Sequence, residues 1–343
     1  VCERMASVPE GPNASSSGWA ITQNTVFFID LDYNTPMKVF TQFDDASLRT
    51  LWESAVKQEV VQWPFYALAW HQAWYTHFRP DEQIVIIGDE SHGSVLPLAL
   101  TGKTAHFTGG EEIADYLDAI GPGAHKGALW QEALSVLKAR GVTRLMLRNI
   151  PETSESLTYF RSISATTVTE EDATPLLALP KSFDDYLTTL SRKQRHEMRR
   201  KLRRFDEHYP GHAFTVEDQP DIKLLLDLMR YNDEKQKFLT TAMEGFFFAL
   251  PQTAGGQLKQ FSLIVEGKPI ATTVAFEVGR SLLLYNSGYD PSVEGSGWYL
   301  KSKCIRWAID NGYTQINFLQ GKERYKYDLG AGDFLVYRVS LTL

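Results

Sequence analysis

The sequence predicts an α+β protein of two domains, each with a mixed, mainly antiparallel sheet flanked by helices. The chain has 343 residues, of which 43% are hydrophobic and 22% charged, and this is enough for two ordinary globular cores. One order of elements also occurs twice: hairpin, strand, glycine-containing turn, helix, strand. From the hairpin glycine to the glycine after the helix is 48 positions in the first copy (Gly93 to Gly141) and 45 in the second (Gly267 to Gly312).

The two copies set the expected domain boundaries. Residues 1–35 are rich in Ser, Gly, Pro and Asn and predict a disordered N-terminal tail. Residues 36–175 form the expected first domain, and residues 176–343 the second.

The first copy is predicted from its local patterns. Residues 36–57 indicate a strand, a turn and a helix that Asp45 or Ser47 caps, and residues 65–78 indicate an aromatic helix that packs on the core or lines a cleft. Residues 83–100 form a hairpin pattern. Residues 115–150 are typical of a strand, a Gly-Pro-Gly turn, a helix and a second strand.

The second copy begins with a hairpin over 261–278 that turns at Glu266-Gly267-Lys268. The run "SLLLYNSGYDP" continues as a strand, the helix that follows ends at Gly312, and "YTQINFL" is the last strand.

A basic segment lies between the two copies. Ser182 with Asp185, and Ser191 with Gln194, have capping-box spacing and predict two short helices. Residues 190–204 contain eight basic residues and one acidic residue, a net charge of +7, in a chain of net charge −7. The predicted inward stripe consists of Leu190, Gln194, Met198, Leu202 and Phe205. The charged faces are then either solvated or bind an anionic partner, such as a nucleotide or tRNA.

Composition argues against several classes of protein. The two cysteines predict no disulfide and fit a reducing, cytoplasmic location, and the eight histidines show no metal-ligand spacing. No apolar run has the ~20 residues that a transmembrane helix needs, and the first residues lack the pattern of a signal peptide.

The stretch "YNSGYDPSVEGSGWYL" leaves a strand and opens a helix through Gly-x-Gly. Main-chain N–H groups at such a helix start form an anion site, because glycine lets a phosphate approach the backbone closely. The candidate amides belong to Gly295, Ser296, Gly297 and Trp298. An ordinary flexible connection explains the same residues, so the loop alone does not decide between the two.

The order of elements around this loop resembles the core of GNAT acyltransferases, whose equivalent loop holds the pyrophosphate of acetyl-CoA. In that family the loop reads Gln/Arg-x-x-Gly-x-Gly/Ala, and here Ser292 takes the first position while Gly295 and Gly297 match. The stretches "YNSGYDP", "WAIDNGYTQINFLQGKERYKYDLGA", "LSRKQRHEMRRKLRRFDE" and "EIADYLDAIG" are similar to the CelD-like branch, which is linked to cellulose or exopolysaccharide biosynthesis. The tandem layout is similar to that of FemAB-type peptidyltransferases.

This resemblance implies an acyl-CoA co-substrate, no metal, and acyl transfer to an amine of a small-molecule or cell-envelope precursor. It implies that main-chain N–H groups of Leu284, Tyr285 and Asn286 polarise the thioester carbonyl, and that Tyr325 protonates the leaving thiolate. The alternates for Tyr325 include Tyr285. The base candidates are Glu323 and Glu277, whose pKa burial would raise. The expected substrate-binding residues are Lys326, Tyr289, Arg195 and Arg199.

Two other functions fit the same sequence. One is a FemAB-type ligase that takes its aminoacyl group from charged tRNA, which suits the basic helix. The other is a non-catalytic binding module that has kept the fold. Under the acyl-CoA hypothesis the first copy should lack a donor site, because Pro122 removes an N–H from its Gly121-Pro122-Gly123 turn.

Overall fold

The computed structural model describes residues 37–253 and 257–343, to which the structural statements below refer. The expected tail of residues 1–35 lies outside these ranges. Residues Thr35–Leu343 form one compact unit.

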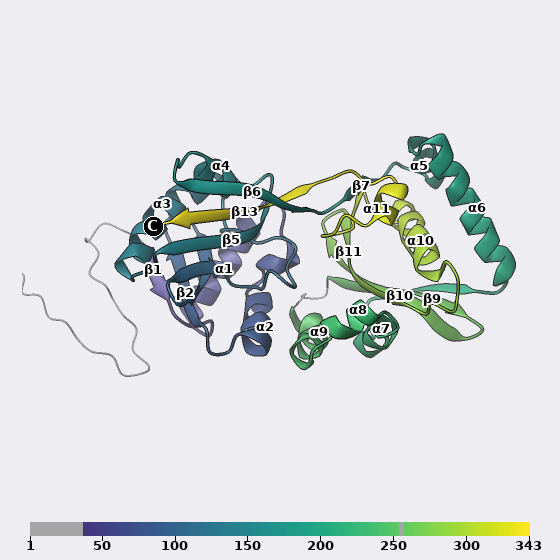
Figure 1. Ribbon diagram of the computed structural model, residues 1–343, viewed down its shortest axis with the longest axis horizontal. Helices are drawn as coiled ribbons and strands as arrows, with labels where there is room; N and C mark the ends of the chain where they lie inside the picture. The colour runs from purple at the N-terminus through teal and green to yellow at the C-terminus, as the bar shows by residue number, and fades with distance from the viewer. Residues whose placement is uncertain (1–36, 254–256) are drawn as a thin grey trace, which may run out of the picture. The chain divides into compact units, whose positions relative to one another are not determined.

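The first sheet has seven strands, and Figure 1 shows its strands with helix α1 beside them. Only β4 and β5 pair in parallel, and the other neighbours are antiparallel. In spatial order the strands are β1 (Met37–Phe40), β2 (Gln83–Asp89), β3 (Ser94–Thr101), β4 (Thr104–Phe107), β5 (Arg144–Pro151), β13 (Leu335–Thr342) and β6 (Thr166–Ala173).

The helices of the first half follow the predicted order. Asp45 caps α1, since its carboxylate accepts hydrogen bonds from the N–H groups of Ser47 and Leu48, as expected. The hairpin of β2 and β3 is also confirmed. The helices are α1 (Ala46–Gln58), the 3₁₀ turn η1 (Pro64–Tyr66), α2 (Leu68–Phe78), α3 (Gly123–Ala139) and α4 (Glu155–Arg161).

The strand predicted just before the Gly-Pro-Gly turn is wrong. Residues 115–120 form no strand, and only Ile120 makes a single bridge, to Val95. The segment is buried because its polar groups bind the second half of the chain. Asp115 accepts from the N–H of Gln320 at 2.7 Å, and the hydroxyl of Tyr116 accepts from the Asn317 amide at 2.7 Å.

The second sheet has six strands, and only β11 and β12 pair in parallel. The predicted hairpin of β9 and β10 is confirmed. In spatial order the strands are β7 (Leu176–Ala178), β12 (Gln315–Asn317), β11 (Ser281–Tyr289), β10 (Lys268–Val278), β9 (Leu258–Val265) and β8 (Ala213–Glu217).

Helices cover both faces of this sheet. Figure 1 shows α10 and α7 on opposite sides of it, and the two helices belong to different apolar clusters. Gly312 has a φ of +77° just beyond α10, which explains the end of that helix. The helices are α5 (Phe183–Thr189), α6 (Arg192–His208), α7 (Ile222–Met229), α8 (Asp233–Phe238), α9 (Thr241–Thr253), α10 (Ser296–Asp310) and α11 (Arg324–Asp328).

The basic helix α6 begins and packs as predicted. Ser191 and Gln194 form a capping box at its start. Met198 and Phe205 are buried, as is Leu190 just before the helix. The apolar stripe therefore faces the second sheet's core and leaves most basic side chains at the surface.

The fold class is confirmed: two mixed, mainly antiparallel sheets are each flanked by helices. The last strand, however, does not follow the chain order. Strand β13 comes after the whole second sheet and inserts between β5 and β6 of the first. The sheet of the expected second domain, residues 176–343, thus lacks the final strand of that range.

Candidate functional site

The loop of residues 290–298 connects β11 to α10 and has a defined conformation. The Asp290 carboxylate accepts hydrogen bonds from the N–H and the hydroxyl of Ser292, at 2.9 and 2.6 Å. Gly295 has a φ of +81° and caps α10, and a Cβ there would meet no atom within 4 Å. The backbone at Gly295 is therefore open to a ligand.

Three of the four predicted amides at this helix start are free. In the described part of the chain, no group accepts a hydrogen bond from the N–H of Gly295, Gly297 or Trp298. The N–H of Ser296 instead donates to the Val293 carbonyl at 3.2 Å, and its side chain is buried. Free N–H groups at the positive end of a 15-residue helix suit a phosphate or another anion.

Tyr289 lies over the start of α10. A Cβ added to Gly297 would come within 2.9 Å of its ring, so glycine at 297 is what lets the tyrosine pack there. The Tyr289 side chain remains 43% exposed. Its role as a substrate-binding residue stays a prediction.

An ion pair joins the loop to the basic helix. Nη2 of Arg204 lies 2.9 Å from Oε2 of Glu294, so the acidic side chain beside the free amides has a cationic partner. A cavity of about 130 Å³ lies between the helix and the loop, with Lys201 stacked 4.7 Å from the Trp298 ring. Its lining includes Arg200, Lys201, Arg204, His208 and Glu294.

The two arginines chosen from the sequence are not in this lining. Arg195 donates to the Leu187 carbonyl at 3.4 Å, toward helix α5, and Arg199 is exposed. The cavity is lined instead by Arg200 and Arg204, which are four residues apart on one face of α6.

Strand β11 has a bulge in its pairing with β10, and its pairing with β12 stops before that bulge. The register with β10 slips so that Val274 faces Asn286 while Ala275 faces Leu284, which leaves Tyr285 as the extra residue. Strand β12 pairs with β11 only over Ser281–Leu283. Residues 284–286, whose N–H groups are expected to polarise a carbonyl, thus lie where β12 no longer covers the edge of β11.

The side chain of Tyr285 is not available for proton transfer. Its hydroxyl donates to the Ile113 carbonyl at 2.8 Å, and its ring packs against Phe276 and Trp70. Burial raises its pKa, and nearby Asp115 raises it further. The structure therefore corrects the expectation of a catalytic phenol at this position.

Lys326 is almost completely buried and shapes the loop after β12. Its Nζ atom donates to the carbonyl groups of Leu319, Gln320 and Gly321 at 2.8–3.0 Å, and pairs with Glu323 at 2.9 Å. Leu319 has a φ of +57°, which is uncommon for leucine and implies backbone strain. Its carbonyl is one of the three that accept a hydrogen bond from Lys326. The ammonium has no donor left over for a substrate, contrary to expectation.

Glu323 and Tyr325 lie near the same loop. The Glu323 side chain is 56% exposed and pairs with Lys326. Tyr325 packs its ring edge-on against Phe318, and burial, followed by the Glu323 carboxylate, raises its pKa. A phenol whose pKa is raised stays protonated and can donate.

Glu277 lies at the other end of the sheet. It opposes Leu282 on β11, whereas Tyr289, next to the 290–298 loop, opposes Ala271 at the far end of the same strand. Its carboxylate accepts from the Tyr313 hydroxyl and pairs with Lys259 at 3.1 Å. The structure excludes the predicted role of Glu277 as base at the loop.

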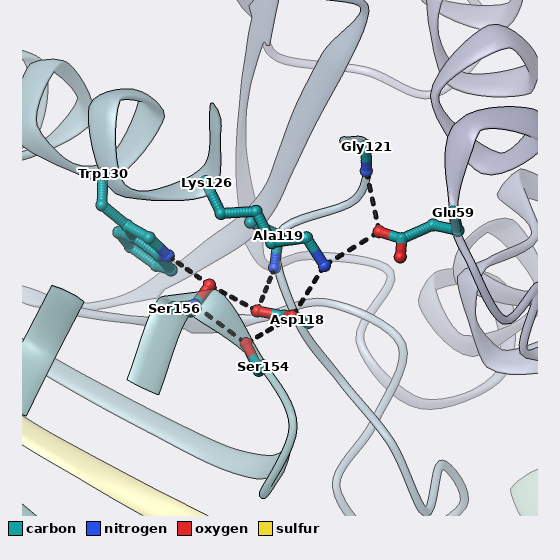
Figure 2. Close-up of polar contacts among 8 residues, drawn as sticks. All are labelled: Glu59, Asp118, Ala119, Gly121, Lys126, Trp130, Ser154 and Ser156. Atoms are coloured by element: carbon teal, nitrogen blue, oxygen red, sulfur yellow. Dashed lines mark hydrogen bonds and ion pairs between the residues drawn. The ribbon is translucent and has the colours of Figure 1, made fainter. Parts of the chain in front are cut away.

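In the first half, the Gly121-Pro122-Gly123 turn before α3 binds a carboxylate of the protein itself. The carboxylate of Glu59, at the end of α1, accepts from the N–H of Gly121 at 2.8 Å and from Nζ of Lys126 at 2.9 Å (Figure 2). Burial raises the pKa of Glu59, against the pull of Lys126. A side-chain carboxylate thus occupies the position where an external phosphate would bind at the start of α3.

Asp118 completes this buried network. It accepts from Lys126 and Ser154 on one oxygen and from Ser156 and the N–H of Ala119 on the other, at 2.5–2.8 Å (Figure 2). Both oxygens of Asp118 are therefore hydrogen-bonded, and one oxygen of Glu59 accepts from Gly121 and pairs with Lys126. Sequence reasoning attributed the missing donor site to Pro122, and it did not identify Glu59 or Lys126.

Two classes of site are not seen in the described residues. Among residues 37–253 and 257–343, no group of three or more His, Cys, Asp or Glu side chains could hold a metal ion. Within the same ranges, no helix has the length and apolar character needed to cross a membrane.

Comparison with known families identifies the second half. Residues 192–327 match the family model described as an acetyltransferase (GNAT) domain. This segment of the chain is therefore similar to a GNAT acetyltransferase domain. The matched residues include the basic helix α6, the 290–298 loop and α11 as far as Tyr327. A search of curated proteins gave no significant match.

Solved structures resemble the whole chain in fold. A conserved protein of unknown function from Bacteroides thetaiotaomicron has a TM-score of 0.61 at 15% identity, over 88% of this chain and 99% of that one. FemX has 0.59 at 11% identity, over 84% and 95%. L-PGS from Bacillus licheniformis has 0.54 at 15% identity, over 79% and 90%. At these identities the likeness shows the fold alone.

Proposed function

We propose that the protein is an N-acyltransferase that transfers an acetyl or other acyl group from acyl-CoA to an amine. The main support is the set of free N–H groups at Gly295, Gly297 and Trp298, on a loop inside the segment that is similar to a GNAT domain. These groups would bind the CoA pyrophosphate, and Arg204 would offset the charge of Glu294 beside it. The donor site then belongs to residues 176–343, the proposed second domain.

The chemistry requires an attacking amine, a polarised carbonyl and a protonated leaving group. The thioester would lie beside the bulge, where main-chain N–H groups of residues 284–286 polarise its carbonyl. Glu323 would take the proton that the amine loses as its nitrogen bonds to the carbonyl carbon. Tyr325 would give a proton to the CoA thiolate as the carbon–sulfur bond breaks.

The first half would bind the acceptor. It contains a cavity of about 680 Å³, a size usual for small-molecule sites, with Gly110, Glu111 and Arg148 in its lining. Ile113 follows Gly110 and Glu111 in the chain, and its carbonyl accepts a hydrogen bond from the Tyr285 hydroxyl at the bulge of β11. A cell-envelope or polysaccharide precursor, as in the CelD-like branch, is the proposed acceptor class, and a cytoplasmic location is part of this proposal.

A FemAB-type, tRNA-dependent peptidyltransferase is the second candidate. The fold likeness to FemX and the exposed basic side chains of α6 favour it. In that case the 290–298 loop would not bind CoA. Charged tRNA would bind the exposed basic face of α6.

Isothermal titration with acetyl-CoA tests the first candidate. We expect binding by the parent protein and at least a tenfold loss in Gly297→Trp, because the indole would cover the free amides. Gly123→Trp is the matched control: it lies at the start of α3, where a Cβ has room, and should bind like the parent. No binding by the parent would refute acyl-CoA dependence. Binding that survives Gly297→Trp would refute the loop as donor site.

The same protein preparation tests the second candidate. Binding of tRNA that weakens with salt, and that is lost when Arg199, Arg200, Arg203 and Arg204 are replaced by Ala, would favour the peptidyltransferase. We expect no such binding if the donor is acyl-CoA. A protein that binds neither acetyl-CoA nor tRNA would be the non-catalytic module.

A further inference from the structure

Lys301 is a buried lysine without a carboxylate partner. It lies on the second turn of α10, is 6% exposed, and its Nζ donates to the Thr273 hydroxyl at 2.9 Å. In the described ranges, no carboxylate lies within 4.0 Å of this ammonium. A buried cation is costly unless an anion pairs with it, so its position calls for an explanation.

A second lysine reaches the same place from a different helix. Lys235 on α8 is partly buried, and its Nζ donates to the carbonyl of Ser287. Ser287 and Thr273 are direct partners in the β10–β11 ladder, so the two ammonium groups are anchored on one residue pair. No described carboxylate lies within 4.0 Å of the Lys235 ammonium either.

This pair is next to the bulge of β11. The hydroxyl of Thr273, which binds Lys301, donates in turn to the carbonyl of Asn286 at 3.0 Å. Asn286 follows the extra residue Tyr285, and β12 no longer covers this edge of β11. Both lysines are therefore anchored within two residues of the bulge, Lys301 through the Thr273 hydroxyl and Lys235 through the Ser287 carbonyl.

The surrounding charges do not neutralise the pair. Burial lowers the pKa of Lys301 to about 8, and Lys235 and Lys326 add repulsion. The one carboxylate that attracts all three lysines is Glu323, and it already pairs with Lys326 at 2.9 Å. Asp115 and Asp172 also attract Lys326, but neither lies within 4.0 Å of the ammonium of Lys235 or Lys301, so these two cations lack a paired anion in the described part of the chain.

We propose that Lys235 and Lys301 bind a carboxylate that one of the two substrates carries. The inference rests on the proposed function, which places the reacting thioester at the bulge. Carboxylate is the anionic group that a short acyl chain or an amino acid can place there. Its two sources are a dicarboxylic acyl donor, such as succinyl-CoA, and an acceptor amine that is itself an amino acid.

Titration calorimetry on the full chain distinguishes the sources. In the donor arm, succinyl-CoA should bind the parent at least tenfold more tightly than acetyl-CoA, and this ratio should approach one in Lys301→Met and in Lys235→Met. In the acceptor arm, amino acids (glycine, alanine and glutamate) should bind the CoA complex at least tenfold more tightly than their amides. Lys303→Met, on the same helix, is the control and should keep the parent's ratios.

The outcomes are separate from those of the proposed function. Normal acetyl-CoA binding with no preference for carboxylate in either arm would overturn the lysine pair alone. A preference that persists in both lysine variants would also overturn it. Failure of the parent to bind acetyl-CoA would overturn the proposed function, and this inference with it.

Discussion

The guanidinium of Arg204 and the carboxylate of Glu294 lie 2.9 Å apart and connect helix α6 to the loop that opens α10. Both side chains are largely exposed, so the pair should contribute at most about 1 kcal/mol to stability. The main effect of this ion pair is electrostatic, because it lowers the positive potential that a ligand meets at the free amides.

Glu294→Gln should therefore strengthen acetyl-CoA binding. The change removes a negative charge near the proposed phosphates and frees Arg204 to contact them, and we expect an affinity several-fold higher at low salt, with a smaller gain in 0.5 M salt. Glu207→Gln is the control, because Glu207 pairs with Arg203 on the solvent side of the same helix. Calorimetry at two salt concentrations measures the effect. An affinity that does not change would mean that the phosphates bind elsewhere.

Lys126→Met should destabilise the fold strongly without affecting donor binding. It leaves Glu59 and Asp118 buried with no cation, and removing one partner of a buried ion pair usually costs about 3–5 kcal/mol. Urea unfolding measures the loss. Lys138→Met, in the exposed last turn of the same helix, should cost less than about 0.5 kcal/mol. A small loss in Lys126→Met would show that the network is not maintained as described.

Lys326→Met separates a structural from a substrate-binding role. Three carbonyl groups would lose their donor, and we expect the free energy of unfolding to fall by about 3 kcal/mol as acetyl-CoA affinity also falls. Lys326→Arg should not restore either, since the planar guanidinium cannot reproduce three diverging bonds. If urea unfolding is unchanged while acceptor binding is lost, the lysine contacts substrate as the sequence suggested.

His71 should make stability depend on acid pH. The ring is buried, its Nδ1 lies 2.7 Å from the Thr108 hydroxyl, and burial lowers its pKa to about 3. Between pH 6.5 and about 3 the histidine is protonated in the unfolded chain but neutral in the folded chain. The free energy of unfolding therefore falls as the pH falls through this window. The advantage of the parent over His71→Gln should shrink by about 3 kcal/mol from pH 7 to pH 4.5.

Urea unfolding at the two pH values measures this change. His208→Gln is the matched control for replacing an exposed histidine on α6. A constant difference between the parent and His71→Gln would mean that the histidine is charged in the folded state or is not buried.

Local patterns predicted the features that depend on local chemistry. The Asp45 cap, the Ser191–Gln194 capping box and both hairpins follow from neighbouring residues, and so does the glycine that opens α10. The positions that were predicted wrongly depend on distant partners. Residues 115–120 look like a strand, but Asp115 binds a group 205 positions away.

The site residues divide in the same way. The loop amides lie at the start of a helix, as predicted, because the backbone geometry there follows from glycine. The bulge of β11 was not predicted. The roles of charged side chains could not be read from spacing. Lys326 binds main-chain carbonyl groups. Glu277 lies at the end of β10 that is distant from the 290–298 loop. Glu59 binds a glycine 62 positions further along the chain.

Strand β13 also bears on how the protein is made. The place between β5 and β6 is filled by a strand that the ribosome adds only after every strand of the second sheet. Until then a nascent chain holds β5 and β6 with unpaired edges facing one another across a gap, and such edges invite pairing with other chains. We infer that the first sheet is completed after synthesis of the second, although most of its sequence comes first.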